Sequence, residues 1–86
     1  MEIDFTKGFV KQLERMPTNQ QLKVRAAIAL FMRDAATAKL RNHKLRGKWQ
    51  GYRSISAGGD IRLHYRVTGI KQVLFVAVGT HHQLYQ

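Results

Sequence analysis

The feature that most constrains the fold of this chain is a strict alternation near its C-terminal end. From Ile61 to Val67, apolar residues occupy every second position, and arginine or histidine stands between them. A period of two is typical of a half-buried β-strand. Turn-forming residues lie on both sides, Gly-Gly-Asp at 58–60 and Thr-Gly at 68–69, and an apolar run from Val73 to Val78 follows. The sequence therefore predicts an antiparallel meander with one basic face.

Two stretches with helical spacing precede this meander. Thr6 is a predicted N-cap for a helix that ends near Met16, and Pro17 separates it from a second helix at about 20–36. Apolar positions on the first are Phe9, Val10, Leu13 and Met16; those on the second form two stripes, Leu22, Ala26, Ala29 and Leu30, and Val24, Ile28, Phe31 and Ala35. We expect all of them in the core, since a wide apolar face packs on both a sheet and another helix.

These elements predict the fold class. We expect an α+β fold in which two N-terminal helices pack on one face of a small antiparallel β-sheet. Residues 1–5 form a short strand, 37–50 an irregular basic connector ending at Trp49, and 51–57 a further strand. Residues 80–85 form a last helical turn or a tail. A length of 86 residues fits a single domain covering 1–86.

The charge of the chain indicates the chemistry of its partners. Fifteen Lys and Arg stand against five Asp and Glu, a formal net charge of +10. Such a balance favours a polyanionic partner, namely nucleic acid, an anionic membrane or an acidic protein. The absence of cysteine excludes disulfides and thiolate zinc sites. With no signal peptide or membrane-spanning run recognisable, we expect a cytoplasmic protein and no membrane partner.

No short motif identifies a reaction, but the residue types suit RNA cleavage. That reaction needs a base for the ribose 2′-OH, an acid for the leaving oxygen, and cations for the developing charge. Histidine, arginine and aromatic residues meet these needs without a metal or another cofactor. A metal site built from the chain's histidines is the less favoured alternative.

Each candidate also has a structural interpretation. His43 can be an ordinary loop histidine, and His64 is expected to be solvated on the open sheet face. Tyr85 can be a packing residue, and Trp49 is more readily a core residue or lid than a stacking platform. The pair at 81–82 follows a buried strand and Gly79, which favours function, and Arg62 lies opposite the core face, which favours a phosphate contact.

Three stretches carry a family resemblance. They are 43–53 (HKLRGKWQGYR), 60–66 (DIRLHYR) and 78–85 (VGTHHQLY), the last with the pattern Gly-Thr-His-x-x-Leu-aromatic. The chain resembles the RelE/ParE superfamily of bacterial type II toxins, and is most similar to its YafQ-like branch. The resemblance implies a microbial RNase fold and a ribosome-dependent endoribonuclease that cuts mRNA in the 30S A site. It also implies a cognate acidic antitoxin.

Carried over by position, the resemblance implies catalytic roles for His43, Asp60, Arg62, His81 and Tyr85. We expect the RNA-binding residues to be Lys44, Arg46, Lys48, Trp49, Arg53, His64 and His82. The branch usually has histidine where Ser56 stands and tryptophan where Ile61 stands. The loss of that histidine removes one candidate acid or base, for which His64 or His82 would compensate.

Two other functions stay open. A ParE-like inhibitor of DNA gyrase would use the same fold and charge without cutting RNA, although it has no need of the histidines and terminal aromatic. A non-catalytic RNA- or ribosome-binding module is the other alternative, and the serine at position 56 keeps it open.

Overall fold

A computed structural model gives the structure of residues 1–85. The elements in chain order are β1 (Glu2–Phe5), α1 (Lys7–Glu14), α2 (Thr18–Arg33), η1 (Ala38–Leu40), β2 (His43–Lys44), η2 (Gly47–Trp49), β3 (Arg53–Ser56), β4 (Ile61–Gly69), β5 (Gln72–Thr80) and α3 (His81–Leu84). The predicted α+β class is confirmed. Within the described part of the chain, no helix is long and apolar enough to cross a membrane.

The strands form one sheet in the order β1-β5-β4-β3-β2. The predicted antiparallel meander is β3, β4 and β5. Two details differ from the prediction: β1 pairs parallel with β5, so the sheet is mixed, and β2 adds an edge strand within the predicted irregular connector. Gly58 and Gly59, with φ of 101° and 54°, form the β3–β4 turn in the left-handed region that favours glycine.

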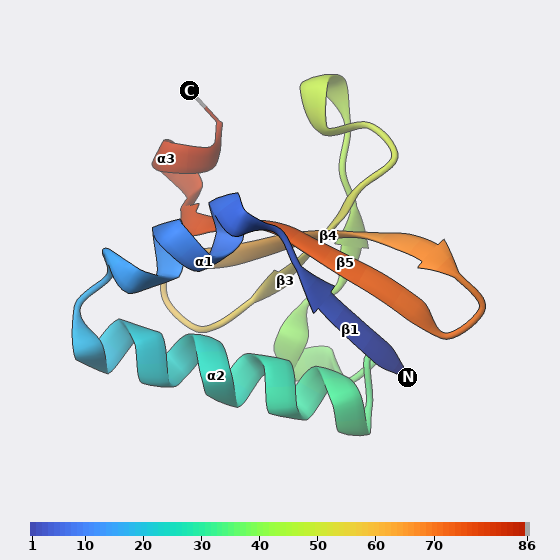
Figure 1. Ribbon diagram of the computed structural model, residues 1–86, viewed down its shortest axis with the longest axis horizontal. Coiled ribbons are helices and arrows are strands. Elements are labelled where there is room, and N and C mark those ends of the chain that lie inside the picture. Colours follow the sequence, from blue (N-terminus) through green and yellow to red (C-terminus); the bar gives the residue numbers. More distant parts are fainter. Residues whose placement is uncertain (86) are drawn as a thin grey trace.

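The long helix α2 lies on one side of this sheet, and the short helix α3 and the η2 loop lie on the other. Figure 1 shows α2 below the sheet, with α3 and the loop containing η2 rising above it. The core lies on the helix side and joins α1 and α2 to the sheet; its residues are Phe9, Val24, Ala27, Phe31, Leu40, Ile55, Ile61, Leu63, Tyr65, Val73, Phe75 and Val78. The opposite face is therefore left for polar chemistry.

The predicted core face of α2 was too wide. Only one stripe is fully buried, at Val24, Ala27 and Phe31, because the helix contacts the sheet along a single line. Leu22 is 62% exposed, and Ala26 and Ala29 are also exposed, so their assignment to the core was wrong. Val10 on α1 is likewise 42% exposed.

A β-bulge sets which side chains of β5 face the core. The register passes from His64↔Ala77 to Tyr65↔Phe75, so Val76 is the extra residue. The bulge explains why residues 73–78 are apolar without alternation. Ordinary alternation along β4 places His64 on the open face while Tyr65 points to the core.

Candidate active site on the open sheet face

Two rows of side chains cross the sheet face opposite the helices. Cross-strand pairing aligns His43, Ser54, His64 and Ala77 in one row. The next row contains Ser56, Arg62 and Gly79. Residues two apart in a strand share a face, so both rows lie on the same side. The sheet register thus brings together residues that are far apart in the sequence.

Arg62 is held in place by oxygen acceptors at the end of the second row. Its guanidinium donates to the hydroxyl of Ser56 at 3.3 Å and to the backbone oxygens of Gly59 and Ile61 at 3.0 and 3.1 Å. A hollow of about 290 Å³ lies there, lined by Arg41, His43, Ser56 and Arg62. It combines two guanidinium groups with an imidazole, a set of groups suited to binding a phosphate.

The backbone selects one tautomer of His43. Its Nδ1 lies 2.8 Å from the carbonyl oxygen of Arg41. Because a carbonyl oxygen only accepts hydrogen bonds, Nδ1 carries the proton in the neutral ring, and Nε2 keeps a lone pair. The exposed imidazole is therefore in the form that a general base requires. Arg41, whose φ of 52° is left-handed, was not predicted as a site residue, and only its place in the basic run hinted at it.

The C-terminal segment is fixed by its own capping box. The Thr80 hydroxyl accepts from the backbone N–H of Gln83, and the Gln83 side chain accepts from that of Thr80. Gly79 permits this closeness, since a Cβ there would lie 2.8 Å from Gln83 Oε1. The start of α3 is also tied to the β3–β4 turn, because His81 N–H donates to the Asp60 carbonyl at 3.1 Å.

Two aromatic rings project from α3 toward the site. His81 stacks on Tyr85 with ring centroids 4.3 Å apart. Burial raises the pKa of the Tyr85 phenol, and the nearby positive charge of Arg62 opposes that rise. The influence of the Arg62 charge on Tyr85 indicates that α3 lies on the same side of the sheet as the second row.

The structure corrects the expectation for His64. It lies on the open face as predicted, yet it is fully buried rather than solvated. Trp49 and Tyr85 cover it, with ring centroids 4.5 and 5.5 Å from the imidazole. Burial, the largest cause, together with the nearby charges of His43 and His81 lowers the pKa of His64 to about 4.

Sequence comparison identifies the family. A family model described as the bacterial toxin of a type II toxin–antitoxin system, YafQ, matches residues 1–86. The chain belongs to the YafQ toxin family. A search of curated proteins gives no match.

Solved structures share the fold of this YafQ-family chain. YafQ from E. coli strain BL21(DE3) has a TM-score of 0.82 at 24% identity, over 99% of this chain and 98% of that one. A chain of the E. coli DinJ-YafQ toxin-antitoxin complex has a TM-score of 0.78 at 25% identity, over 99% and 97%. The YoeB/ParE toxin from Agrobacterium tumefaciens has a TM-score of 0.76 at 21% identity, over 94% and 99%.

The two departures from the YafQ-like pattern have different surroundings. Ser56 lies in the hollow and accepts a hydrogen bond from Arg62, so its hydroxyl helps to position the Arg62 guanidinium. Ile61 is buried in the hydrophobic core, away from the open face. The change at 56 therefore alters the site of this family member directly, while the residue at 61 serves the core.

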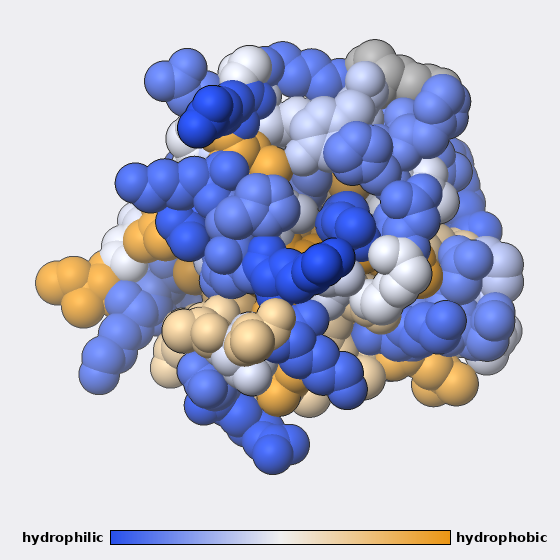
Figure 2. All heavy atoms as spheres, turned by 180° about the vertical axis from the view of Figure 1, so that it is seen from behind, coloured by the Kyte–Doolittle hydropathy of each residue, from blue (hydrophilic) through white to orange (hydrophobic). Residues whose placement is uncertain are grey.

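The predicted RNA-binding residues divide into separate places. Lys44, Arg46 and Arg53 line a groove of about 890 Å³ beside Tyr52. Hydrophilic side chains dominate the face of the molecule seen from behind in Figure 2. Lys48 and His82 are exposed on η2 and α3. Their contact with RNA stays a prediction.

Two of the proposed RNA-binding side chains also hold the structure together. Trp49 Nε1 donates to the carbonyl of Leu84 at 3.0 Å, so the indole is a lid over His64, one of the structural roles expected for it. Arg53 Nε donates to Asn42 Oδ1 at 2.9 Å, and Asn42 also contacts the Tyr65 hydroxyl. Sequence reasoning missed Asn42, because one amide within a basic run carries no distinguishing pattern.

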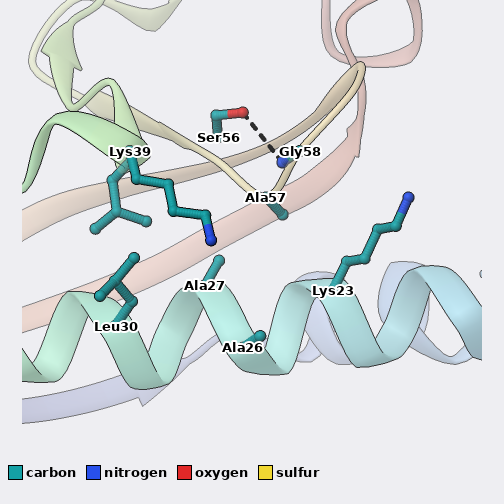
Figure 3. Close-up of a pocket in the computed structure, with 9 residues that line it drawn as sticks. Lys23, Ala26, Ala27, Leu30, Lys39, Ser56, Ala57 and Gly58 are labelled. Atoms are coloured by element: carbon teal, nitrogen blue, oxygen red, sulfur yellow. Dashed lines mark hydrogen bonds between the residues drawn. The ribbon is translucent and has the colours of Figure 1, made fainter.

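A second hollow, of about 270 Å³, lies on the helix side. Figure 3 shows Lys39 extending across it from η1 toward Ala27 and Ala57, while Lys23 projects outward from α2. Its walls are mainly apolar and include no histidine or acid. Within residues 1–85, no three His, Asp or Glu side chains are placed to hold a metal ion. The candidate histidines are thus outside this hollow.

Proposed function

We propose that this toxin is an endoribonuclease that cleaves mRNA in the ribosomal A site by acid–base catalysis and so inhibits translation. The observation that carries the proposal is the hollow where His43 and Arg62 face the same space. Its neighbour is the stacked pair of His81 and Tyr85 on α3. A proton acceptor, a guanidinium and a second histidine then surround one phosphate.

The proposed base is His43. Its Nε2 takes the proton of the ribose 2′-OH, because hydrogen bonding to the Arg41 carbonyl leaves the lone pair on that nitrogen. Asp60, for which the family resemblance also implies a catalytic role, is the alternative base. Its backbone carbonyl already fixes His81, and its exposed carboxylate lies in the turn beside the site. The tautomer and the position in the hollow favour His43.

The proposed acid is His81. The deprotonated 2′-oxygen attacks phosphorus, and the bond from phosphorus to the 5′-oxygen breaks. The imidazolium of His81 gives its proton to that leaving oxygen, which yields a 2′,3′-cyclic phosphate and a 5′-hydroxyl. Arg62 stabilises the charge on the non-bridging oxygens, and Tyr85 stacks on a neighbouring base.

We propose that the RNA continues along the groove lined by Lys44, Arg46 and Arg53. Lysine and arginine neutralise phosphates and release counterions, so binding should weaken as salt rises. The net charge of +10 supports a polyanionic surface such as the ribosome and its mRNA. An intracellular site of action in the cytoplasm follows from this substrate.

We also propose that a cognate acidic antitoxin neutralises this protein. Support comes from the E. coli DinJ-YafQ toxin-antitoxin complex, because this chain shares the fold of one chain of that complex. The helix-side hollow has an apolar floor with Lys23 and Lys39 at its edges, and Leu22 is exposed nearby on α2. An amphipathic acidic segment of the antitoxin complements these features.

Induction in cells tests the proposed activity. Primer extension on mRNA should show cuts within codons after wild-type induction, and none after induction of His81→Ala. Circular dichroism must show that the variant is folded. Intact mRNA together with DNA damage would instead indicate gyrase inhibition, and intact mRNA with blocked translation would indicate a non-catalytic ribosome binder.

A further inference from the structure

A pair of buried polar side chains lies beneath the candidate site. Ser54 and His64 stand opposite each other on β3 and β4, and they are 1% and 0% exposed. Among the described residues, neither Ser54 Oγ nor His64 Nδ1 has a hydrogen-bond partner. Because a buried polar group without a partner is unfavourable, an apolar residue would stabilise the fold better at position 64. The presence of histidine there calls for a role other than core packing.

The contacts of His64 lead from the interior to the site. Its Nε2 lies 3.5 Å from the Tyr85 hydroxyl, at the outer limit for a hydrogen bond. The Tyr85 ring in turn stacks on His81. Trp49 closes the other side of the imidazole and holds α3 through the Leu84 carbonyl. The buried imidazole of His64 therefore contacts both Trp49 and Tyr85, the two aromatic residues next to the C-terminal segment.

These contacts assign a role to a residue for which the family resemblance gives no catalytic one. We propose that His64 is a positioning residue: its neutral imidazole orients the phenol of Tyr85 and, through the stacked rings, the imidazole of His81. The expected effect on cleavage rests on the proposed function, whereas the contacts among His64, Tyr85 and His81 do not depend on it. In this role Nε2 accepts from the Tyr85 hydroxyl, and the proton resides on Nδ1.

The burial of His64 argues against direct proton transfer. The side chain has no exposed surface, and the rings of Trp49 and Tyr85 pack against its imidazole. The charged and titratable groups that act on this cluster are His43, His81 and Arg62, with Tyr85 itself. A proton on His64 would convert Nε2 from an acceptor to a donor and add a like charge beside two histidines. In the folded protein, protonation of His64 should therefore break its hydrogen bond with the Tyr85 hydroxyl.

Nuclear magnetic resonance tests the geometry without any RNA. In protein with ¹⁵N-labelled histidine, we expect His64 to be neutral with the proton on Nδ1 at pH 7. In His64→Leu the ring resonances of Tyr85 and His81 should shift, and in His64→Gln, whose amide oxygen can accept from the phenol, they should stay near wild type. Ser54→Ala is the matched control, since it alters the buried pair without touching Tyr85.

The second measurement is cleavage kinetics. We expect His64→Leu to lower kcat by about 10-fold or more with little change in KM, because a small displacement of a reacting group has a large effect on rate. His64→Gln should recover most of that loss, and Ser54→Ala should match wild type. A proton on Nε2 at pH 7, or unchanged Tyr85 and His81 resonances in a folded His64→Leu protein, would overturn the inference. If the resonances behave as expected but the wild-type protein does not cleave RNA, the proposed function is overturned and the positioning role of His64 is not.

Discussion

Acid should destabilise this protein through His64. Burial, with smaller contributions from the charges of His43 and His81, lowers the pKa of that imidazole from 6.5 to about 4. As pH falls, the unfolded chain takes up a proton near pH 6.5, whereas the folded chain does so only near pH 4. The unfolded state therefore binds more protons between these values, and stability decreases as the pH drops through that window.

The size of the loss follows from the two pKa values. The pKa difference between 6.5 and about 4, at ~1.4 kcal/mol per unit, lowers the free energy of unfolding by about 3.5 kcal/mol in total. Between pH 7.5 and 4.5 the same linkage gives about 2.5 kcal/mol. A loss of that size is a large fraction of the margin expected for a small domain.

Urea denaturation at these two pH values measures the effect. The contribution of other groups to acid sensitivity is shared by wild type and His64→Gln, so their difference isolates the histidine. We expect wild type to lose about 2.5 kcal/mol more than the variant on going from pH 7.5 to 4.5. His82→Gln, which removes a histidine from the exposed side of α3, should behave as wild type. Equal losses in wild type and His64→Gln would refute the reasoning.

Three further predictions concern the site, its support and its partner. Arg62→Gln should lower RNA cleavage by about 100-fold in single-turnover assays, because the developing phosphate charge loses a guanidinium; unchanged rates would exclude that role. Thr80→Ala should lower the free energy of unfolding by about 1 kcal/mol in thermal melts, because the capping box of α3 is lost. Ala26→Glu should weaken antitoxin binding by about 10-fold in calorimetry by placing an acid in the helix-side hollow, while Ala29→Glu, on the same helix but outside the hollow, should not.

Much of the fold could be predicted because its signals are local. The alternation from 61 to 67 and the glycine turn before it define β4 and its pairing with β3. Thr6 caps α1 by accepting from Phe9 N–H, as its position before an apolar stripe indicates. The exposed stripe of α2 and the parallel pairing of β1 were missed, because both depend on where the sheet ends. The sequence of α2 carries no information about the width of the sheet on which the helix packs.

The structure brings several of the predicted site residues together, but the burial of one of them could not be predicted from the sequence. His43 and Arg62 come to one hollow because β2, β3 and β4 align them, and the residue types alone suggested phosphate chemistry. The burial of His64 could not be foreseen, since the rings that cover it, Trp49 and Tyr85, come from the η2 loop and from the end of α3. The bulge opposite Tyr65 is equally invisible in sequence, yet it decides which face each β5 side chain takes.

The chemistry of the RNA ends tests the central claim most directly. Purified toxin, ribosomes programmed with a defined mRNA, and the His43→Gln variant would be incubated in parallel, and the cleaved ends would be identified by mass spectrometry. The proposed mechanism predicts a 2′,3′-cyclic phosphate and a 5′-hydroxyl from wild type and at least about 100-fold less product from His43→Gln. Uncut mRNA with wild type, or equal cleavage by a folded His43→Gln protein, would contradict it.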